Sequence, residues 1–595
     1  MNPHHLKLLK KAQALERGGR ALEAAAAYKV FLCREPKHTD AWSDYAGQLI
    51  LLGRLDEAQS ACEAALALDQ GHPSARINLG VILMRRDQLD GCERHLRQVL
   101  EAAPDRLDAQ LFLAECLLNK KNPEGAELVL KAIPPGGARD GAYALLKRRH
   151  AELWTILGLA FLEVQKFSRA EEACRAALRI EPSNLMAQAN LGSIQMAQGH
   201  LVEAERLFQL HLSEHPTDEN ARLLLITCLA RKGDLALMDQ EIEKVLQQEP
   251  TNFVVHKSLS GTYYTLGRWD AYRAEITRFR AVDPASAYLD YEQSFVDLLF
   301  GDMRQGWQHF EARLKIPKEL RLKKRSFQQP AWQGEPFEGK TILLWAEQGL
   351  GDTLMFLRYV PLVKALGGRV IVEAQPPLMD VAATCPGADI IIPKGAPWVP
   401  FDLQASLMSL PCLFGTELAT VPAEVPYLGV PENVPHGPAL QECLDRAGER
   451  TRIGLVWAGS PGHGRDFERS LPVAFLEPLA SLPGVAWFSF QVGNQDVPPL
   501  PDLTVLTPLL GDFSDTAFAL NAMDLLITVD TSVAHLAGAM GIPTLLLLSY
   551  QPDYRWMLER TDSPWYPTMR LYRQPAYGDW GSVIRQVIED LTQDS

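Results

Sequence analysis

The first half of the chain repeats one pattern of small, large apolar and polar positions. Proline closes successive blocks at Pro182, Pro216, Pro250 and Pro284, which stand 34 residues apart. Within each block, apolar residues recur at three- and four-residue intervals in two consecutive segments, as in helices with one buried face. Proline ends the second segment because it has no N–H to continue the helical hydrogen bonds. The pattern predicts an array of antiparallel helix pairs.

This period resembles that of the tetratricopeptide repeat, or TPR, whose arrays bind other proteins. We expect a repeat solenoid of about eight to nine repeats over residues 1–314. The distance from Pro104 to Pro182 exceeds two periods by ten residues. We place this surplus in the loop around Pro134–Gly137. A degenerate last block around Trp307 and Arg313 is predicted to cap the solenoid. The expected block starts lie near His5, Thr39, Pro73, Leu107, Ala151, Leu185, Glu219 and Phe253.

The sixth position of each repeat is expected to face the concave groove of the solenoid. Asparagine at this position can bind the backbone of an extended peptide, whereas an apolar side chain suits an amphipathic helix. The alternative is that some of these residues belong to the core between repeats. The candidate groove residues are Asn78, Phe112, Ile156, Asn190 and Leu224; the other sixth positions are Lys10, Asp44 and Ser258.

After a basic connector at residues 315–329, short apolar runs alternate with helical segments. Runs such as LLLL are typical of parallel strands that are buried on both faces. A proline-rich passage, residues 422–438, divides this half, so we expect two Rossmann-like lobes at residues 330–435 and 436–595. Ligands of such sheets bind beyond the carboxyl ends of the strands. The predicted strands are residues 340–345, 369–373, 389–392, 403–408, 452–457, 485–491, 525–529 and 544–548.

The loop after the first predicted strand contains Gly349, Gly351 and Asp352. Glycines allow the backbone to approach a ligand closely, and a carboxylate at this edge could take a proton from a hydroxyl group as a general base. The alternative is that Asp352 only caps the following helix, a role that aspartate favours.

A second loop, with Asp530, Thr531, Ser532 and His535, joins a predicted strand to a helix. Free N–H groups and the helix dipole favour an anion at such a helix start. The two hydroxyl groups can add hydrogen-bond donors, and His535 could donate to a phosphate. The alternative is a capped helix without a ligand, with His535 in the core.

A third loop, rich in glycine and arginine, follows the first strand of the second lobe. Gly459 and Ser460 lie at its start, and Arg469 or Arg465 could bind a nucleotide phosphate through a guanidinium fork. Gln491 ends another predicted strand and could meet a base or a ribose. The alternative for each arginine is a solvated surface position.

Three segments together resemble the bacterial TPR-bearing GT-B glycosyltransferases, whose catalytic half is related to the family-nine lipopolysaccharide heptosyltransferases. They are LLWAEQGLGDTLMFLRYVPLV, IGLVWAGSP and ITVDTSVAHLAGAMGIPT. The resemblance implies an α-helical TPR solenoid followed by an α/β GT-B fold, with Asp352 as the base. It places Arg469 where the family has a phosphate-binding lysine. It also places Asp530, Thr531 and His535 at the donor phosphate, with Ser532 where glycine is usual.

The chain is most similar to the TPR-containing flagellin glycosyltransferases. This similarity implies a nucleotide-sugar donor, possibly a CMP-activated nonulosonic acid, and transfer to Ser or Thr of flagellin held by the repeats. The chain has no D-x-D pair, with which many glycosyltransferases bind a divalent metal, so we expect neither a metal nor another cofactor. Two alternatives remain: a transferase for a glycan or lipid-linked acceptor, and a TPR scaffold whose GT-B half is inactive.

Composition narrows the remaining classes. The net charge of −14 argues against a general nucleic-acid binder, which needs a basic surface. The nine cysteines form no C-x-x-C pair, and no Walker A sequence is present. The N-terminus lacks the apolar core of a signal peptide, and no apolar run approaches a membrane span of about 18 residues. We therefore expect a cytoplasmic protein.

Overall fold

The computed structural model describes residues 2–133, 141–164, 166–316, 327–459, 466–493 and 496–593. They form two compact units that divide between Ser258 and Leu259. The predicted loop Pro134–Gly137 and most of the predicted connector lie outside the described residues, as do Ser460 and Arg465.

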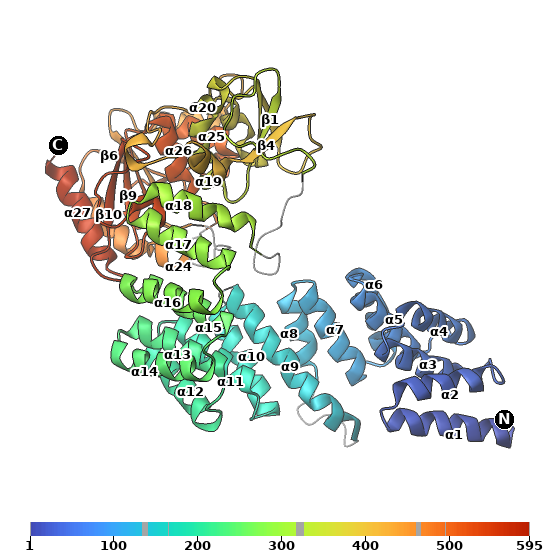
Figure 1. The fold of residues 1–595 in the computed structure, drawn as a ribbon. Helices are drawn as coiled ribbons and strands as arrows, with labels where there is room; N and C mark the ends of the chain where they lie inside the picture. The colour runs from blue at the N-terminus through green and yellow to red at the C-terminus, as the bar shows by residue number, and fades with distance from the viewer. Residues whose placement is uncertain are drawn as a thin grey trace. The chain divides into compact units, whose positions relative to one another are not determined.

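The first unit is built from antiparallel helix pairs, which follow one another along the chain (Figure 1). The predicted block starts at Thr39, Pro73, Leu107, Leu185 and Glu219 each begin a helix, which confirms the helical solenoid. The helices are α1 (Pro3–Arg17), α2 (Ala21–Leu32), α3 (Thr39–Leu51), α4 (Leu55–Leu68), α5 (Pro73–Arg85), α6 (Leu89–Ala102), α7 (Leu107–Asn119), α8 (Pro123–Lys131), α9 (Gly141–Glu163), α10 (Phe167–Ile180), α11 (Leu185–Ala197), α12 (Leu201–Glu214), α13 (Glu219–Lys232) and α14 (Leu235–Gln248).

Small residues let the two helices of a repeat approach closely. A Cβ atom on Gly158 of α9 would lie 2.5 Å from the sulfur of Cys174 on α10. A Cβ atom on Gly192 of α11 would lie 2.6 Å from the ring of Phe208 on α12. Because protein interiors are close-packed, no larger side chain fits at either glycine without displacing Cys174 or Phe208 on the partner helix.

Helix α9 corrects one prediction. It has 23 residues, whereas α11 has 13, so the ten extra residues prolong a helix. The sequence analysis instead placed this surplus in the loop at Pro134–Gly137. The added segment, GAYALLKRRH, contains mostly residues with a high helix propensity, which explains why it is helical.

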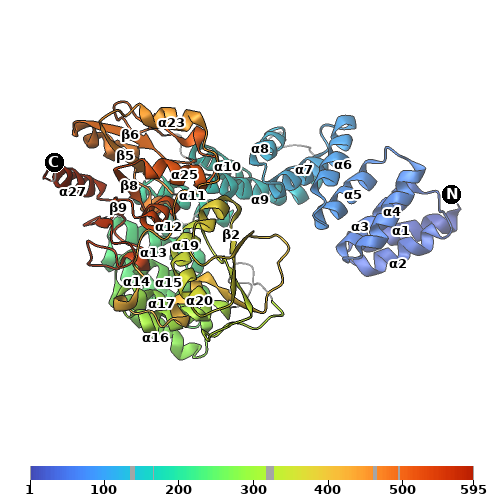
Figure 2. The same cartoon turned by 90° about the horizontal axis from the view of Figure 1, so that it is seen from above.

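The second unit starts inside α15 (Phe253–Thr265) and continues with α16 (Trp269–Val282), α17 (Ala287–Leu299), α18 (Met303–Phe310) and η1 (Glu311–Leu314). Two parallel sheets follow, with strand orders β3-β2-β1-β4 and β10-β9-β8-β5-β6-β7. Figure 2 shows β9, β8, β5 and β6 of the larger sheet in that order. The strands are β1 (Thr341–Trp345), β2 (Arg369–Ala374), β3 (Ile390–Pro393), β4 (Leu403–Ser406), β5 (Thr451–Val456), β6 (Val485–Ser489), β7 (Thr504–Val505), β8 (Leu525–Val529), β9 (Thr544–Leu548) and β10 (Met569–Arg573).

Helices and turns connect these strands and cover the sheets, which makes this part α/β as expected. They are α19 (Leu350–Phe356), η3 (Leu357–Tyr359), α20 (Val360–Ala365), η4 (Pro376–Leu378), α21 (Met379–Ala383), η5 (Leu407–Ser409), α22 (Leu410–Leu413), η6 (Leu418–Thr420), α23 (Pro438–Asp445), α24 (Asp466–Arg469), η7 (Val473–Ser481), η8 (Thr507–Leu509), α25 (Phe513–Asn521), α26 (Ser532–Met540), η9 (Tyr554–Trp556) and α27 (Trp580–Gln593).

The eight predicted strands are all present: β8 and β9 have the predicted bounds, and the other six differ at one or both ends. The strand predicted over residues 403–408 ends at Ser406, and the one predicted over 485–491 ends at Ser489. The edge strands β7 and β10 were not predicted. The helix expected to follow the loop of Asp352 is α19, which ends at Phe356; a 3-10 turn separates it from α20, where Pro361 stands in the first turn.

The last repeat-like helices share a core with the two sheets. The ring of Trp307 lies 5.9 Å from those of Phe356 and Tyr554 and 6.1 Å from that of Trp565. The guanidinium of Arg313 is buried and donates to Glu347 after β1 and to Ser409. Helices α16–α18 are therefore packed as part of the α/β unit.

We predict that a fragment starting at Pro330 is much less stable than one starting at Phe253. The shorter fragment exposes to water the apolar surface that Trp307 and Phe310 cover, and it loses the ion pair between Arg313 and Glu347. Exposing apolar surface costs about 25 cal/mol per Å². Thermal unfolding followed by circular dichroism checks this, and equal melting temperatures for the two fragments would contradict it.

Candidate functional site

Two strand-to-helix loops, one from each sheet, meet inside the second unit. The loop after β1 leads into α19, the loop after β8 leads into α26, and the two helices pack against each other. A Cβ atom on Gly351 would lie 2.7 Å from Cδ2 of His535. Gly351 therefore allows close contact with His535, a side chain of the other lobe.

Asp352 joins this contact through both carboxylate oxygens. Oδ2 accepts a hydrogen bond of 2.8 Å from the N–H of Gly349, which is the residue before α19, and Oδ1 forms an ion pair with Arg555. The side chain is 16% exposed. Burial raises the pKa of Asp352, and the Arg555 charge opposes this rise. The capping interaction is present, and the same carboxylate also faces a cation.

Arg555 was not among the residues predicted from the sequence. This residue lies in the turn η9 after β9, where Asp553 accepts from its Nη1 at 2.7 Å and the ring of Tyr554 lies 4.5 Å from its Cζ. The loop after a parallel strand lies at the same sheet edge as the other strand ends. That rule, applied to the predicted strand at residues 544–548, would have drawn attention to it.

His535 is buried and neutral. Its Nδ1 is 2.9 Å from the hydroxyl of Tyr566, its ring stacks on Trp556, and its Nε2 is 3.8 Å from Asp530 Oδ1. Burial lowers the pKa of His535 well below its ordinary value, and Arg555 lowers it further. The imidazole can therefore exchange hydrogen bonds here but carries no charge near neutral pH.

Asp530 and the start of α26 adjoin the same contact. Burial raises the pKa of Asp530 to about 6, and the negative charge of Asp553 adds to the rise. Thr531 precedes α26 and makes no capping bond through its side chain, and Ser532 is the first helical residue. The first-turn N–H groups of α26 therefore lie at the carboxyl edge of the sheet, as predicted.

Arg469 reaches this region from the loop after β5. Its Nε donates to Asp466 at 2.9 Å and its Nη1 donates to the carbonyl of Asp530 at 3.1 Å, while Nη2 has no partner among the described residues. A Cβ atom on Gly459 would collide with the side chains of Asp466 and Arg469. Gly459 thus allows the arginine to fold over the backbone.

Gln491 is held by the protein backbone. Its Oε1 accepts from the N–H groups of Trp457 and Ala458 at 3.0 and 2.8 Å. Its Nε2 donates to the carbonyls of Ala458 and Val492 at 3.1 and 2.9 Å. All four hydrogen bonds of the amide go to backbone groups at the ends of β5 and β6. Gln491 therefore links these two strand ends, and its amide is not free to meet a base or a ribose.

The candidate groove residues divide into two kinds. Asn78 donates to the carbonyl of Ser43 at 2.9 Å and Asn190 to that of Thr155 at 3.5 Å, so both link neighbouring repeats. Phe112 packs against two apolar clusters between repeats, and Leu224 is half-buried. Ile156 is 41% exposed. Two further apolar side chains on first helices of repeats are exposed: Leu159 of α9 at 42% and Met186 of α11 at 62%.

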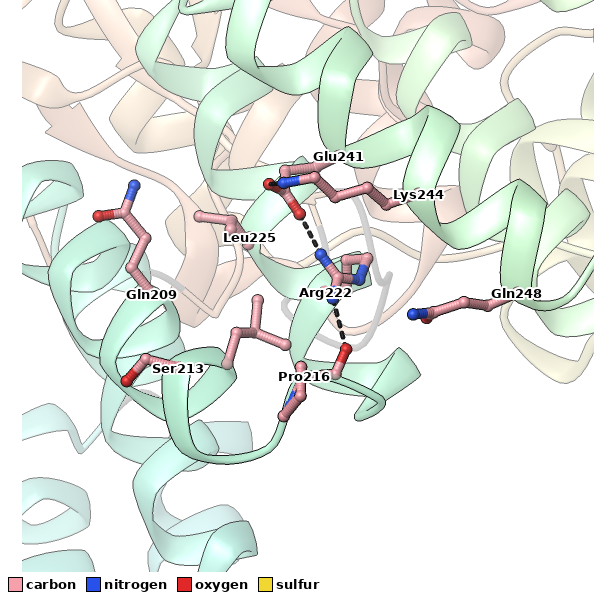
Figure 3. A pocket seen from close by; sticks show the side chains of 9 residues that line it. Gln209, Ser213, Pro216, Arg222, Leu225, Glu241, Lys244 and Gln248 are labelled. Atoms are coloured by element: carbon pink, nitrogen blue, oxygen red, sulfur yellow. Dashed lines mark hydrogen bonds and ion pairs between the residues drawn. The ribbon is translucent and has the colours of Figure 1, made fainter.

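A depression of about 390 Å³ lies elsewhere on the solenoid, between α12, α13 and α14 (Figure 3). Arg222 crosses it, pairing with Glu241 and donating to the carbonyl of Pro216 at 2.6 Å. Both charged side chains are buried. This pair ties three helices together, and sequence reasoning did not foresee it.

Known proteins match the chain in two ways. Models described as tetratricopeptide repeat match residues 9–73, 49–105, 93–149 and 161–225. The N-terminal half is a TPR solenoid. Protein FlbA of Caulobacter vibrioides is 24% identical over 577 residues, which cover 84% of this chain and 95% of FlbA. Superkiller protein 3 of Schizosaccharomyces pombe is 23% identical over 231 residues, 38% of this chain and 16% of that protein.

Among solved structures, that of the MamA protein is similar with 21% sequence identity and a TM-score of 0.26, covering 30% of this chain and 92% of MamA. In the described ranges, no helix is long and apolar enough to cross a membrane.

We predict that Gly351→Ala destabilises the second unit by about 1–3 kcal/mol, because the added methyl group must displace His535. Gly429→Ala is the control, since no atom lies within 4 Å of a Cβ placed there. Chemical denaturation of both variants measures the difference. Equal stabilities would show that the two lobes do not meet as described.

We predict that Asp44→Asn stabilises the first unit by an amount that grows between about pH 4 and pH 6 and is constant above pH 6. Burial and the nearby Glu16 raise the pKa of Asp44 from 3.8 to about 6 in the folded state. The contribution of a carboxyl group with a raised pKa is fully present below 3.8 and is lost as the pH rises through 6. The variant should therefore gain about 1 kcal/mol at pH 7.5 and much less at pH 4. Urea unfolding at both pH values checks the difference, and an equal effect would contradict it.

Proposed function

We propose that the chain is a protein O-glycosyltransferase of GT-B architecture. It would transfer a sugar from a nucleotide-sugar donor, such as a CMP-activated nonulosonic acid, to Ser or Thr of flagellin held by the TPR solenoid. One observation carries the proposal: an ion pair between the two lobes and a further arginine, from loops after three strands of two parallel sheets, lie around Asp530. The pair is Asp352 and Arg555, and the further arginine is Arg469.

Asp352 is proposed as the general base. Its pKa is raised by burial, and the Arg555 charge favours the ionised form that can accept a proton. The acceptor hydroxyl oxygen attacks the anomeric carbon, its proton passes to Asp352, and the bond from that carbon to the nucleotide phosphate oxygen breaks. The electron pair of this bond leaves with the phosphate.

The departing phosphate is proposed to bind Arg469 and the start of α26. Among the described residues, the Nη2 group of Arg469 has no hydrogen-bond partner, so it could donate to the phosphate. First-turn N–H groups of a helix also favour an anion. Thr531 and Ser532 add hydroxyl donors. His535 is neutral, so its contribution is restricted to hydrogen bonding. The scheme uses no metal or other cofactor, and we propose that the reaction takes place in the cytoplasm.

The acceptor is proposed to bind along the exposed apolar positions of the solenoid. Ile156, Leu159 and Met186 offer side chains that an amphipathic helix can cover. Asn78 and Asn190 already bond to neighbouring repeats, so they are less suited to hold an extended peptide. The exposed apolar positions therefore favour a helical acceptor.

Two other functions remain distinguishable by experiment. A glycan or lipid-linked acceptor would be modified without need of the solenoid, so residues 1–258 would be dispensable for transfer. A scaffold with an inactive second unit would bind the acceptor but neither bind nor consume nucleotide sugar.

We predict that Asp352→Asn lowers the rate of transfer at least about 100-fold, because an amide cannot accept the proton. Transfer from a CMP-activated nonulosonic acid to purified flagellin, followed by intact mass, measures this rate. Asp562→Asn is the control, since this aspartate pairs with Arg560 at the surface. Unchanged transfer by Asp352→Asn would exclude it as the base.

We predict that Ile156→Asp weakens flagellin binding about tenfold or more by placing a charge on the apolar contact. Leu128→Asp is the matched control, because Leu128 is 75% exposed on α8, the second helix of its repeat. Isothermal titration calorimetry with purified flagellin compares the two. Equal loss in both variants, or loss in neither, would argue against this surface as the acceptor site.

A further inference from the structure

We propose that Arg555 is a positioning residue for Asp352, and that the last repeat-like helices hold the loop that carries it. This inference rests on the proposed function of the second unit as a transferase. It assigns to the C-terminal end of the repeat array a part in shaping the site, in addition to any role in binding the acceptor.

The ion pair is enclosed on both sides. The side chains of Arg555 and Asp352 are 10% and 16% exposed, and they come from the two different lobes. Arg555 also donates from Nη1 to Asp553 at 2.7 Å. Because a buried carboxylate without a cation is costly, the position of Arg555 decides both the orientation and the ionisation of Asp352.

The loop of residues 549–557, here called the anchor loop, is fixed by the repeat-like helices. The hydroxyl of Tyr264 donates to the carbonyl of Pro552 at 3.2 Å. With its amide oriented to satisfy both neighbours, Gln551 donates to the carbonyl of Tyr264 at 2.9 Å and accepts from the N–H of Gly267 at 2.8 Å. A Cβ atom on Gly267 would lie 2.8 Å from the side-chain amide of Gln551, so the loop sits directly against this turn.

Aromatic packing fixes the next residue of the anchor loop. The ring of Tyr554, adjacent to Arg555, lies 5.8 Å from Phe295 of α17 and 5.9 Å from both Trp307 and Phe310 of α18. Tyr554 is buried, and its neighbours come from helices outside the two sheets. The backbone that carries Arg555 is therefore held from outside the α/β lobes.

The same helices reach the loop that carries Asp352. Arg313 of η1 donates from Nη2 to Glu347 at 3.0 Å and to Ser409 at 2.8 Å. Glu347 also accepts from Ser406 at 2.9 Å, at the end of β4. The segment from α17 to η1 thus holds both loops that contribute to the ion pair. Arg313 binds the loop after β1, and the rings of α17 and α18 pack against Tyr554 in the anchor loop.

Other charges near the pair bear on its titration. Asp553 and Glu347 raise the pKa of Asp352, against the effect of Arg555. The charged or titratable groups that act on the pair are Glu347, Asp530, His535, Asp553 and Tyr554, and Arg358 and Arg469 act on His535 beside it. Among the described residues, Arg555 makes the one direct side-chain ion pair to Asp352. Without Arg555, burial should favour the protonated form of Asp352.

The test is a double-mutant cycle on the full chain, measured as melting temperatures at pH 5 and pH 8. Arg555→Met should lower the melting temperature of the second unit by about 5 °C or more at pH 8, and by less than half as much at pH 5, where Asp352 can take up a proton. Asp352→Asn combined with Arg555→Met should remove this pH dependence and cost no more than the larger single change. Arg560→Met, at a surface ion pair in the same region, is the control.

The proposal would be overturned if the losses in melting temperature of the two single variants add up in the double variant, or if Arg555→Met lowers the melting temperature equally at both pH values. A merely structural arginine would give those results. If Arg555→Met does not fold, Arg555→Lys takes its place in the same cycle, with a smaller shift expected because the charge is kept. These measurements need no substrate.

A second readout connects the pair to transfer. In cells that lack the native chain, Arg555→Lys should restore more of the sugar mass on flagellin than Arg555→Met, and Arg560→Met should restore as much as the unmodified chain. Equal restoration by the lysine and methionine variants would contradict the positioning role. If the unmodified chain adds no mass to flagellin, the proposed function fails, while the melting temperatures still decide whether Arg555 positions Asp352.

Discussion

The contact between α19 and α26 is the constraint on which the second unit depends. Gly351 lies directly against the ring of His535, so the two lobes meet at a distance that no β-carbon tolerates. This approach brings Asp352 within reach of Arg555 and places both near Asp530. Charges that would be costly to bury singly are thereby paired across the two lobes. The same closeness lowers the pKa of His535 and raises that of Asp530, because neither group retains much water.

The helices at the end of the repeat array belong to this arrangement. Trp307 and Tyr554 share one aromatic cluster, and Arg313 lies buried beneath the loop after β1. A boundary drawn where the repeat pattern ends, at Leu314, separates residues that fold together, since the compact unit begins at Leu259. The repeat pattern in the sequence shows only that a segment forms a helix pair. The unit to which a pair belongs depends on the surface that it covers, and the last pair covers the α/β core.

Much of the fold could be predicted from the sequence because it depends on local patterns. Apolar runs located eight of the ten described strands, and the rule for strand carboxyl ends located the loops of Asp352 and Asp530. What escaped prediction depends on contacts between distant segments. Arg555 lies 203 positions after Asp352, and no local pattern marks it as a partner. Gln491 follows a strand like the site residues do, yet backbone groups use its whole amide. The surplus before Ala151 became helix because its own residues favour helix.

The measurement that most directly tests the account is the intact mass of flagellin from cells with and without this chain. The account predicts that deletion removes mass in whole multiples of one sugar residue, and that restoring the chain returns it. An unchanged mass would contradict the assignment of flagellin as the acceptor and would favour another acceptor or a scaffold.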